Sequence, residues 1–391
     1  MVDGERVFAR RANGYRMAAI TMLYLDHNAT TPVLPAAWDA MRPLMAEAFG
    51  NPSSSHAAGR QARRHLEDAR EKVAALLGAL PEEVVFTSGA TEANNIALFG
   101  LCGEPPGRIV ASPLEHPCVT EPLKQLAARG FEIEWLKADA RGVVERRELA
   151  PRVLTSLQLA NHETGAIQPV RAFAELGPVH TDAAQAVGKI PVNLRGLGVT
   201  ALTLSGHKFR GPKGVGALLL RKGTLLRPLQ FGGHQQRGHR PGTEPVALAV
   251  GMAVALDHAV KAMSDTAASL ARLRQRLLDR LRAAVPPVVV NGPLPGEADS
   301  LPTTLNLSFP SCRADLLMMS LDLAGVACSI GSACSSGSLL PSPVLIAMGV
   351  PDDVLKSAVR FSLGETTTEA EMDEAAGRII ASVNAIRAAK L

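Results

Sequence analysis

The stretch Ala201-Leu-Thr-Leu-Ser-Gly-His-Lys208 runs from an apolar segment into a short polar turn that ends in a lysine. The apolar part predicts a buried strand, so Lys208 lies where that strand ends. A lysine in this position is costly unless it is paired or modified, because burial disfavours the ammonium and makes the amine nucleophilic. A single lysine on a loop more often keeps its charged end in water. The surrounding pattern therefore has to decide between the two interpretations.

On both sides of this stretch the sequence alternates between helical segments and short apolar runs. Six more apolar runs predict strands, at residues 84–87, 108–112, 132–136, 153–159, 179–182 and 216–221. Such alternation is typical of an α/β fold with a mostly parallel sheet, which here has seven strands. Ligands of such sheets bind at the carboxyl ends of the strands. The polar residues that follow each run are therefore the first candidates for a functional site.

The pattern changes after a glycine-rich loop at residues 231–243. A long helical region continues to about residue 284, and the sequence then reads as an α+β unit that ends in a helix. We predict a large domain over residues 33–260 and a smaller α+β domain made of residues 23–32 and 261–391. Residues 1–22 lack the apolar core of a secretory signal, so we expect a disordered tail or a misassigned start there.

The composition excludes several classes of protein. The chain has 391 residues, of which 47% are hydrophobic, and this is too many for a disordered protein. Its 41 basic and 37 acidic residues are too balanced for a protein that binds nucleic acid directly. The longest apolar run, residues 246–256, is too short to cross a membrane. The five cysteines predict free thiols in a reducing compartment, and hence a cytoplasmic location.

Two other strand ends carry polar residues. Phe86-Thr-Ser-Gly-Ala-Thr-Glu-Ala-Asn94 passes from a strand through small residues into a helix, whose first N–H groups can cradle a phosphate. Val179-His-Thr-Asp182 ends in an acid that can hold a protonated ring nitrogen. Each motif alone also fits a simple helix cap, made by Ser88 or Thr91 in the first and by Asp182 in the second. A cradle, an acid and a lysine at one sheet edge together predict a pyridoxal-phosphate site.

With these motifs, and with Tyr24-Leu-Asp-His-Asn-Ala-Thr-Thr-Pro32 and Phe49-Gly-Asn-Pro-Ser-Ser54, the sequence resembles the cysteine desulfurases. These belong to the class V aminotransferase-like group of fold type I enzymes, and the resemblance covers residues 23–385. It implies fold type I and a pyridoxal 5'-phosphate cofactor. It assigns the cofactor phosphate to Ala90, Thr91, Ser205, His207 and Thr243, and the cofactor ring to His116, Asp182, Gln185 and Lys208.

The resemblance also gives these residues roles. His116 resembles the histidine that stacks on the ring and exchanges protons with intermediates, and Lys208 the lysine that bonds to the cofactor. Asp182 and Gln185 resemble the partners of the pyridine nitrogen and the phenolic oxygen. In this family the loop that carries Thr243 reaches the phosphate of the other subunit, which implies a homodimer.

Cys334 is set apart from the other cysteines by its surroundings. It lies in Ser329-Ile-Gly-Ser-Ala-Cys-Ser-Ser-Gly337, a run of small residues that is typical of an exposed loop. Its position matches the family nucleophile, so the resemblance implies that L-cysteine becomes L-alanine while Cys334 becomes a persulfide. The sulfur would pass to an acceptor or scaffold protein for iron–sulfur cluster assembly or tRNA thiolation. No metal site is predicted, beyond a transient contact of Cys334 with a nascent cluster. We expect the remaining cysteines to be structural: Cys102, Cys118, Cys312 and Cys328.

The resemblance assigns the substrate to Arg360, Asn28, Asn161 and His162. Arg360 is the expected clamp for the substrate carboxylate, because its guanidinium can bind a carboxylate with two hydrogen bonds. His162 departs from the family, which commonly has asparagine there; its charge would depend on pH, and Asn161 is expected to share the role. A second departure is a shortened segment at residues 170–179, which leaves room for about two helical turns before the strand that presents Asp182.

The sequence alone leaves two other classes of function open. One is a different pyridoxal enzyme of the same fold, such as a selenocysteine lyase or an aminotransferase, and Cys334 favours the desulfurase over it. The other is a degenerate, non-catalytic homologue that serves as a binding partner. The presence of Lys208, Asp182 and Cys334 argues against this last class, whereas His162 and the shortened segment leave it open.

Overall fold

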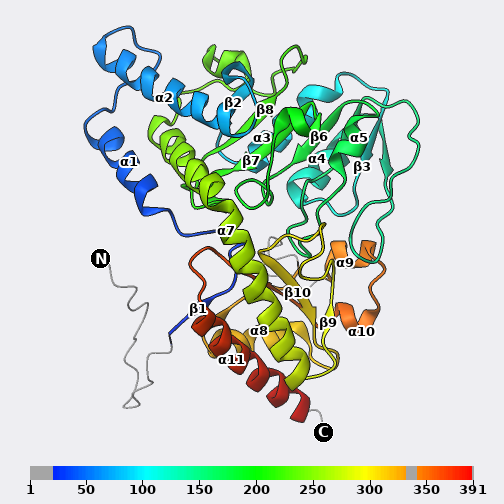
Figure 1. Cartoon of the computed structure of the whole chain (residues 1–391). Coiled ribbons are helices and arrows are strands. Elements are labelled where there is room, and N and C mark those ends of the chain that lie inside the picture. The colour runs from blue at the N-terminus through cyan, green and yellow to red at the C-terminus, as the bar shows by residue number, and fades with distance from the viewer. Residues whose placement is uncertain (1–20, 332–340, 390–391) are drawn as a thin grey trace.

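A computed structural model describes residues 21–331 and 341–389 (Figure 1). The larger part of the molecule is built on a seven-stranded sheet of order β2-β8-β7-β6-β5-β3-β4. Its strands are β2 (Val84–Thr87), β3 (Gly107–Ala111), β4 (Phe131–Trp135), β5 (Leu154–Ser156), β6 (Val179–Asp182), β7 (Ala201–Ser205) and β8 (Gly216–Leu220). Neighbouring strands are parallel except where β8 pairs with β2 and β7. The seven predicted strands and the mostly parallel α/β sheet are thereby confirmed.

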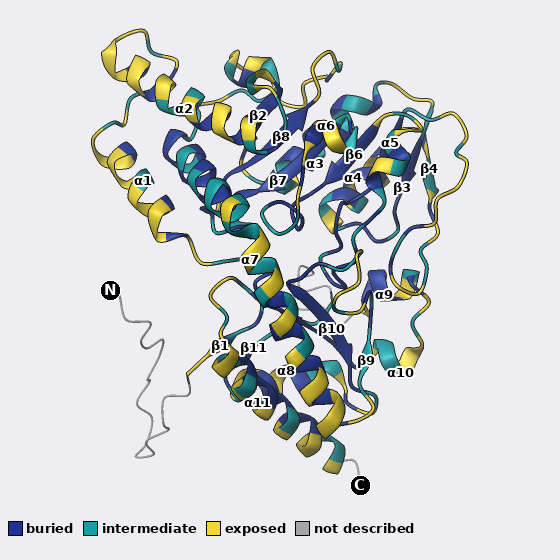
Figure 2. Ribbon diagram, viewed as in Figure 1, coloured by how far each residue is buried: buried dark blue, intermediate teal, exposed yellow. Residues whose placement is uncertain are grey.

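Helices cover the sheet. They are α1 (Pro35–Ala46), α2 (Ala57–Leu76), α3 (Ala90–Cys102), α4 (Pro117–Ala128), α5 (Val170–Ala174) and α6 (Leu194–Leu197). Every residue of β2, β6, β7 and β8 is buried, which explains why these strands read as continuous apolar runs. Figure 2 shows the buried sheet inside and the exposed sides of the helices facing outward.

The shortened segment forms a single short helix, α5, of five residues. Despite this, β6 keeps both of its neighbours: Val179 pairs with Thr155 of β5, and Asp182 pairs with Thr203 of β7. The short connection therefore does not disturb the strand that carries Asp182.

A single long helix, α7 (Val246–Ala284), extends through both parts of the molecule (Figure 1). Its first buried residues, Val246 to Leu256, belong to the hydrophobic core around the sheet, and those from Leu270 to Leu281 belong to a second core. No α7 residue between positions 257 and 269 is buried. By length and composition alone, this helix could cross a membrane. Its buried apolar residues, however, pack in the two hydrophobic cores.

The second core lies in the smaller part of the molecule. Here β10 (Thr304–Ser308) pairs in antiparallel fashion with β9 (Val289–Val290) and β12 (Ala358–Ser362), and β1 (Leu23–Tyr24) pairs with β11 (Val326–Ala327). The helices of this part are α8 (Ala314–Leu323), α9 (Pro343–Ala347), α10 (Asp352–Leu355) and α11 (Glu369–Ala388). A bridge between Asp26 and Ser362 brings the segment after β1 beside β12, where Arg360 lies.

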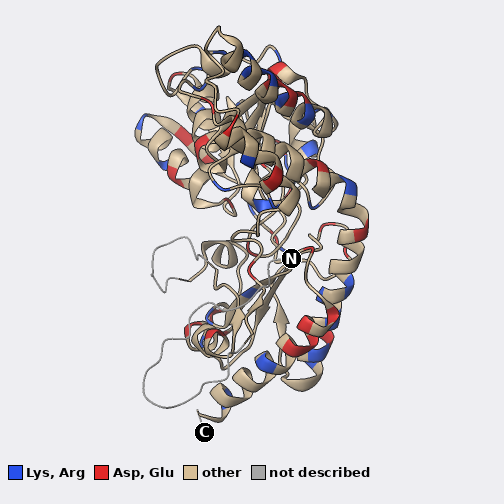
Figure 3. Ribbon diagram, turned by 90° about the vertical axis from the view of Figure 1, so that its left-hand side faces the viewer, with Lys and Arg blue, Asp and Glu red and all other residues tan. Residues whose placement is uncertain are grey.

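Acidic and basic residues are mixed over the surface (Figure 3). On the smaller part, they join α7 to α11 through ion pairs: Asp373 lies 2.7 Å from Arg276 and 2.6 Å from Arg280. This mixture matches the balanced charge of the sequence, with a net charge of +4.

Candidate active site

The predicted polar residues meet at one edge of the large sheet. Asp182 is the last residue of β6, and Ser205 is the last residue of the adjacent β7. A 3-10 helix, Gly206–Lys208, then turns the chain and carries Lys208 away from the strand end. Because β6 and β7 are parallel neighbours, their carboxyl ends share this edge.

The carboxylate of Asp182 is held by hydrogen bonds to both of its oxygens. Oδ1 accepts a hydrogen bond from the backbone N–H of Ala184 at 2.9 Å, and Oδ2 accepts one from the Asn94 amide at 2.7 Å. The Cys118 thiol lies 3.7 Å from the same Oδ2. These contacts fix the orientation of the acid at the strand end.

Asn94 and Cys118 were not expected in the site. Asn94 lies within the phosphate-cradle motif, three residues after Thr91 on α3, and this spacing on one helix face was the available signal. Cys118 was expected to be a structural residue, whereas its thiol contacts Asp182, Asn94 and His116. Burial, and next the charge of Asp182, raise the pKa of Cys118. The thiol therefore stays protonated and acts here as a weak hydrogen-bonding group.

Lys208 is surrounded by the segment that follows β1. Its Nζ donates to the carbonyl of Asn28 at 2.5 Å and to that of Ala29 at 3.0 Å. The hydroxyl of Thr31 donates to the carbonyl of His207 at 2.8 Å, which fastens the same segment to the lysine turn. The contacts hold the amine in place at the sheet edge.

Asn28 connects several parts of the site. It is 1% exposed, and its Nδ2 donates to the carbonyl of His162 at 3.2 Å and to Oγ1 of Thr304 at 2.8 Å. Its Oδ1 accepts a hydrogen bond from Lys189 at 3.1 Å. Both amide hydrogens thus bond within the protein, and the predicted contact of Asn28 with the substrate stays a prediction. The structure gives this side chain the role of joining the two parts of the molecule.

The predicted phosphate cradle lies at the start of α3. The residue before the helix is Gly89, and no side chain caps the helix there, so the alternative that Ser88 or Thr91 makes a cap is wrong. Ala90 and Thr91 are the first residues of the helix. Their N–H groups point out of its N-terminal end and have no partner within the helix. The Ser205 hydroxyl lies 3.7 Å from the point where a side-chain carbon on Gly89 would be placed. An uncapped helix start beside a hydroxyl suits an anion.

His207 contacts the same region. Its Nδ1 lies 3.2 Å from Oγ1 of Thr30. Burial, and next the charge of Lys208, lower the pKa of His207 to about 4. The imidazole is therefore neutral near pH 7 and offers a hydrogen bond rather than a charge.

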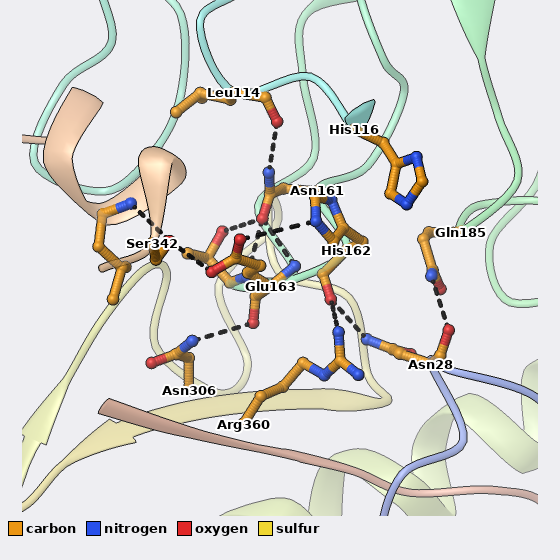
Figure 4. A network of polar contacts seen from close by, with 12 residues as sticks. Asn28, Leu114, His116, Asn161, His162, Glu163, Gln185, Asn306, Ser342 and Arg360 are labelled. Atoms are coloured by element: carbon orange, nitrogen blue, oxygen red, sulfur yellow. Dashed lines mark hydrogen bonds and ion pairs between the residues drawn. The ribbon is translucent and has the colours of Figure 1, made fainter. Parts of the chain in front are cut away.

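His116 precedes α4 and caps it. The backbone N–H of Cys118 donates to Nδ1 of His116 at 3.1 Å, so the neutral ring carries its proton on Nε2. Burial lowers the pKa of His116, while the nearby carboxylate of Asp182 acts in the opposite direction. The ring meets that of His162 edge to face, with centroids 5.1 Å apart. The bond to Nδ1 thus sets the tautomer of the neutral His116 ring and leaves Nε2–H available in the site; Figure 4 shows the ring beside the loop of His162.

The loop after β5 carries the departure from the family. Asn161 is fully buried; its Nδ2 donates to the carbonyl of Leu114 at 3.0 Å, and its Oδ1 accepts from the N–H groups of Glu163 and Thr164 at 2.8 and 2.9 Å. The side chain therefore shapes the loop (Figure 4), and its predicted share in substrate binding stays a prediction. The buried Glu163 in turn accepts a hydrogen bond of 2.6 Å from Ser342.

His162 points into the site. Burial lowers the pKa of His162 well below its usual value, and the positive charges of His116, Arg360 and Lys208 lower it further. The expected pH-dependent charge is thus absent from the ring near neutral pH. Its Nδ1 is buried and has no hydrogen-bond partner among the described residues. A bound molecule in the site is the natural partner for this atom.

Arg360 lies on β12 and faces the same loop (Figure 4). It is 4% exposed; its Nη2 lies 2.6 Å from Asp26, and its Nη1 donates to the carbonyl of His162 at 3.0 Å. Its buried Nε has no partner within the described part of the chain. The ion pair fixes the guanidinium, and the N–H groups that remain are suited to a substrate carboxylate.

Two predicted residues are not placed among these. Thr243 is exposed on the loop that precedes α7, and Cys334 lies outside the described residues. Cys102 and Cys312 are buried, as expected for structural cysteines. Burial raises the pKa of Cys102 and of Cys328 to about 12, so neither thiol is an activated nucleophile.

The chemistry of these residues fits pyridoxal phosphate. The start of α3 offers N–H groups for a phosphate, Asp182 a carboxylate for a ring nitrogen, and Lys208 an amine for an aldehyde. The buried, unpartnered nitrogens of His162 and Arg360 provide donors or acceptors for a substrate. Within residues 21–331 and 341–389, no group of three or more His, Cys, Asp or Glu side chains is arranged to hold a metal ion.

Comparisons with known proteins agree with this geometry. The family model for aminotransferase class V matches residues 23–374. The chain is 42% identical to "Cysteine desulfurase IscS" of Dictyoglomus turgidum over 364 residues, which cover 90% of this chain and 92% of that protein. It is 40% identical to "Cysteine desulfurase, mitochondrial" of Drosophila melanogaster, over 93% of this chain and 81% of that protein.

Two solved structures also resemble this chain. A "NIFS-LIKE PROTEIN" superposes with a TM-score of 0.86 at 38% identity, over 92% of this chain and 99% of the other. "SspA in complex with cysteine" superposes with a TM-score of 0.77 at 32% identity, over 88% and 99% of the two chains. The chain therefore belongs to the class V aminotransferases and, among these, to the pyridoxal-phosphate-dependent cysteine desulfurases.

Proposed function

We propose that the protein transfers the sulfur of L-cysteine to Cys334, releasing L-alanine, and then delivers it to an acceptor protein. The observation that carries this proposal is that Lys208, Asp182 and His116 lie together at the sheet edge, opposite Arg360. Bound pyridoxal phosphate supplies an electron sink for negative charge at the substrate Cα. A relative's structure named as a complex with cysteine supports the choice of substrate.

Each of these residues has its own role in the proposed reaction. Arg360 binds the substrate carboxylate, and Asp182, held by Asn94, keeps the ring nitrogen of the cofactor protonated. Lys208 moves the proton at the substrate Cα. The Nε2 proton of His116 is the one available for exchange, because its Nδ1 is occupied. The Cys334 thiol gains the sulfur atom as a persulfide, and the rest of the L-cysteine molecule leaves as L-alanine, so the atoms of the two reactants balance.

A homodimer is part of the proposal. Gln236 is buried, and its Oε1 accepts hydrogen bonds from the Phe86 N–H at 2.8 Å and from Arg70 at 3.0 Å. These bonds hold Gln236 and Arg237 in left-handed conformations, with φ of +47° and +57°. Residues other than glycine rarely adopt such conformations. The rigid loop leads to the exposed Thr243, which we assign to the phosphate of the partner subunit.

The surface near this loop supports the same assignment. Phe231, at the start of the loop, is 87% exposed, and Phe49 is 78% exposed. Large exposed aromatic side chains are typical of an interface. We expect sedimentation equilibrium to give twice the chain mass, 82 kDa from two chains of 41.1 kDa each. A mass of one chain at micromolar concentration contradicts the dimer.

The acceptor and the location complete the proposal. The name of the relative from Dictyoglomus turgidum links it to the iron–sulfur type of desulfurase, so we propose a scaffold protein for cluster assembly as the acceptor. The described cysteines are free thiols, which supports a reducing compartment, and we propose the cytoplasm.

The decisive experiment incubates the purified protein with L-cysteine and measures alanine and persulfide by mass spectrometry. We expect one alanine per persulfide, and the extra 32 Da of sulfur on the peptide that contains Cys334. Cys334→Ala should lose both products and keep the visible absorption of the bound cofactor. Cys328→Ala is the matched control, because that neighbouring cysteine has a raised pKa and should change little. Alanine formation at the wild-type rate by Cys334→Ala contradicts the assignment of the nucleophile.

A further inference from the structure

Lys189 is a second lysine at the site, which neither the sequence motifs nor the proposed reaction uses. It follows β6 by seven residues, and its Nζ donates to Oε1 of Gln185 at 2.6 Å and to Oδ1 of Asn28 at 3.1 Å. Among the described residues, no carboxylate lies within ion-pair distance of it. Burial, and next the charges of Lys208 and Arg360, lower the pKa of Lys189 well below its usual value. A lysine is costly in such a position, so its contacts call for an explanation.

The amide orientations around Lys189 follow from their other partners. Asn28 uses Nδ2 to donate to the carbonyl of His162, and a carbonyl can only accept. Its Oδ1 therefore faces Lys189. In the same way Gln185 uses Nε2 to donate to the carbonyl of Asn28 at 3.0 Å, so its Oε1 faces Lys189. Both contacts of Lys189 are thus made with amide oxygens, whichever protonation state the amine has.

These bonds leave one hydrogen of the Gln185 amide unused. The side chain is 6% exposed, its oxygen is bound to Lys189, and one of its two Nε2 hydrogens is bound to Asn28. Among the described residues no partner accepts the second hydrogen, which is therefore left for the site, and Figure 4 shows Gln185 beside Asn28. Without Lys189, the hydrogen bond to the Asn28 carbonyl alone would hold the amide.

We propose that Lys189 is a positioning residue that fixes the Gln185 amide with its N–H toward the phenolic oxygen of pyridoxal phosphate. This inference rests on the proposed function, which places the cofactor ring beside Gln185. A fixed hydrogen-bond donor stabilises negative charge on that oxygen. We therefore expect the visible absorption band of the holoprotein to titrate at a lower pH than it would with a less firmly held amide.

The test is a pH titration of the visible absorption band of the holoprotein. Loss of one hydrogen bond in Lys189→Met should raise the midpoint by roughly 0.5–1 pH unit. Lys189→Arg, which keeps a side-chain N–H donor, should recover most of the wild-type midpoint. Lys222→Met is the matched control, because it removes an exposed lysine that pairs with Glu82. An unchanged midpoint in Lys189→Met contradicts the role of Lys189.

A double-mutant cycle tests whether Lys189 acts through Gln185. Gln185→Ala should raise the midpoint by itself, and adding Lys189→Met should then raise it much less than in the wild type. Fully additive shifts overturn the inference, because they mean that the two residues act independently. If Lys189→Met cannot be purified, Lys189→Gln takes its place in the cycle. A wild type that binds no pyridoxal phosphate would instead contradict the proposed function, so the two failures are distinguishable.

Discussion

The Asn94 amide donates a hydrogen bond of 2.7 Å to Oδ2 of Asp182, which joins the start of α3 to the end of β6. The two ends of the cofactor site, the phosphate cradle and the acid, are thus fastened to each other. Asn94→Ala removes this bond and leaves Oδ2 with the weak thiol donor of Cys118. Since a hydrogen bond to a charged group contributes about 1.5–3 kcal/mol, we expect the Kd for pyridoxal phosphate to rise about tenfold or more.

The neighbouring residue offers a matched control for this measurement. Asn95 follows Asn94 on α3, but its amide donates to the carbonyl of Thr91 on the exposed side of the helix. Asn95→Ala should therefore leave the Kd nearly unchanged when both variants are titrated with the cofactor by fluorescence. Equal effects of the two substitutions would mean that helix stability, and not the bond to Asp182, determines the affinity.

Arg360 should control substrate affinity. Arg360→Lys keeps a positive charge beside Asp26 but loses the planar set of donors that a carboxylate needs. We expect KM for L-cysteine to rise at least tenfold, with the visible absorption of the bound cofactor retained. Arg276→Lys, which alters a surface ion pair with Asp373, is the control. An unchanged KM in Arg360→Lys removes Arg360 from the carboxylate site.

His162 should not contribute to the pH dependence of the reaction near neutrality. Because burial lowers the pKa of His162 well below its usual value, the ring is neutral throughout the range from pH 6 to 8. His162→Asn should therefore change KM while leaving the shape of the kcat/KM profile over this range the same. If the wild-type kcat/KM profile has an acidic limb and His162→Asn lacks it, His162 titrates between pH 6 and 8 and the prediction is wrong.

His180 should make the stability of the protein depend on pH. It is fully buried between Ser156 and Thr203, at 3.1 and 3.2 Å, and burial lowers its pKa to about 4. The unfolded chain, with an ordinary histidine pKa near 6.5, binds the proton more readily, so the free energy of unfolding falls as the pH drops from about 6.5 to about 4. The full effect is about 3 kcal/mol.

Urea unfolding at several pH values checks this prediction. His180→Asn should reduce the fall in unfolding free energy between pH 7 and pH 4.5, even though the variant is less stable at pH 7. His234→Asn, at an exposed position, should keep the wild-type dependence. A variant at position 180 with the full wild-type dependence would assign the effect to other histidines with a lowered pKa, such as His27 and His207.

The candidate site was predicted unevenly from the sequence. Lys208, Asp182, His116 and Arg360 could be found because each occupies a recognisable motif or a strand end. Asn28 and Asn161 were found as substrate ligands, and that role stays a prediction; the structure adds that their amides also bond within the protein. A motif identifies a residue type at a position, but the partners of a side chain are set by neighbours that the motif does not contain.

The sequence by itself determined the seven strands, their alternation with helices and the edge of the sheet at which the lysine and the acid lie. These follow from local apolar periodicity, which acts over a few residues. Only the tertiary structure decided which side chains hold those groups, because the partners are far apart in the chain: Asn94 and Asp182 are 88 positions apart, and Asn28 and Lys189 are 161 apart. Such contacts arise when packing of the two cores brings distant segments together, and no local pattern encodes them.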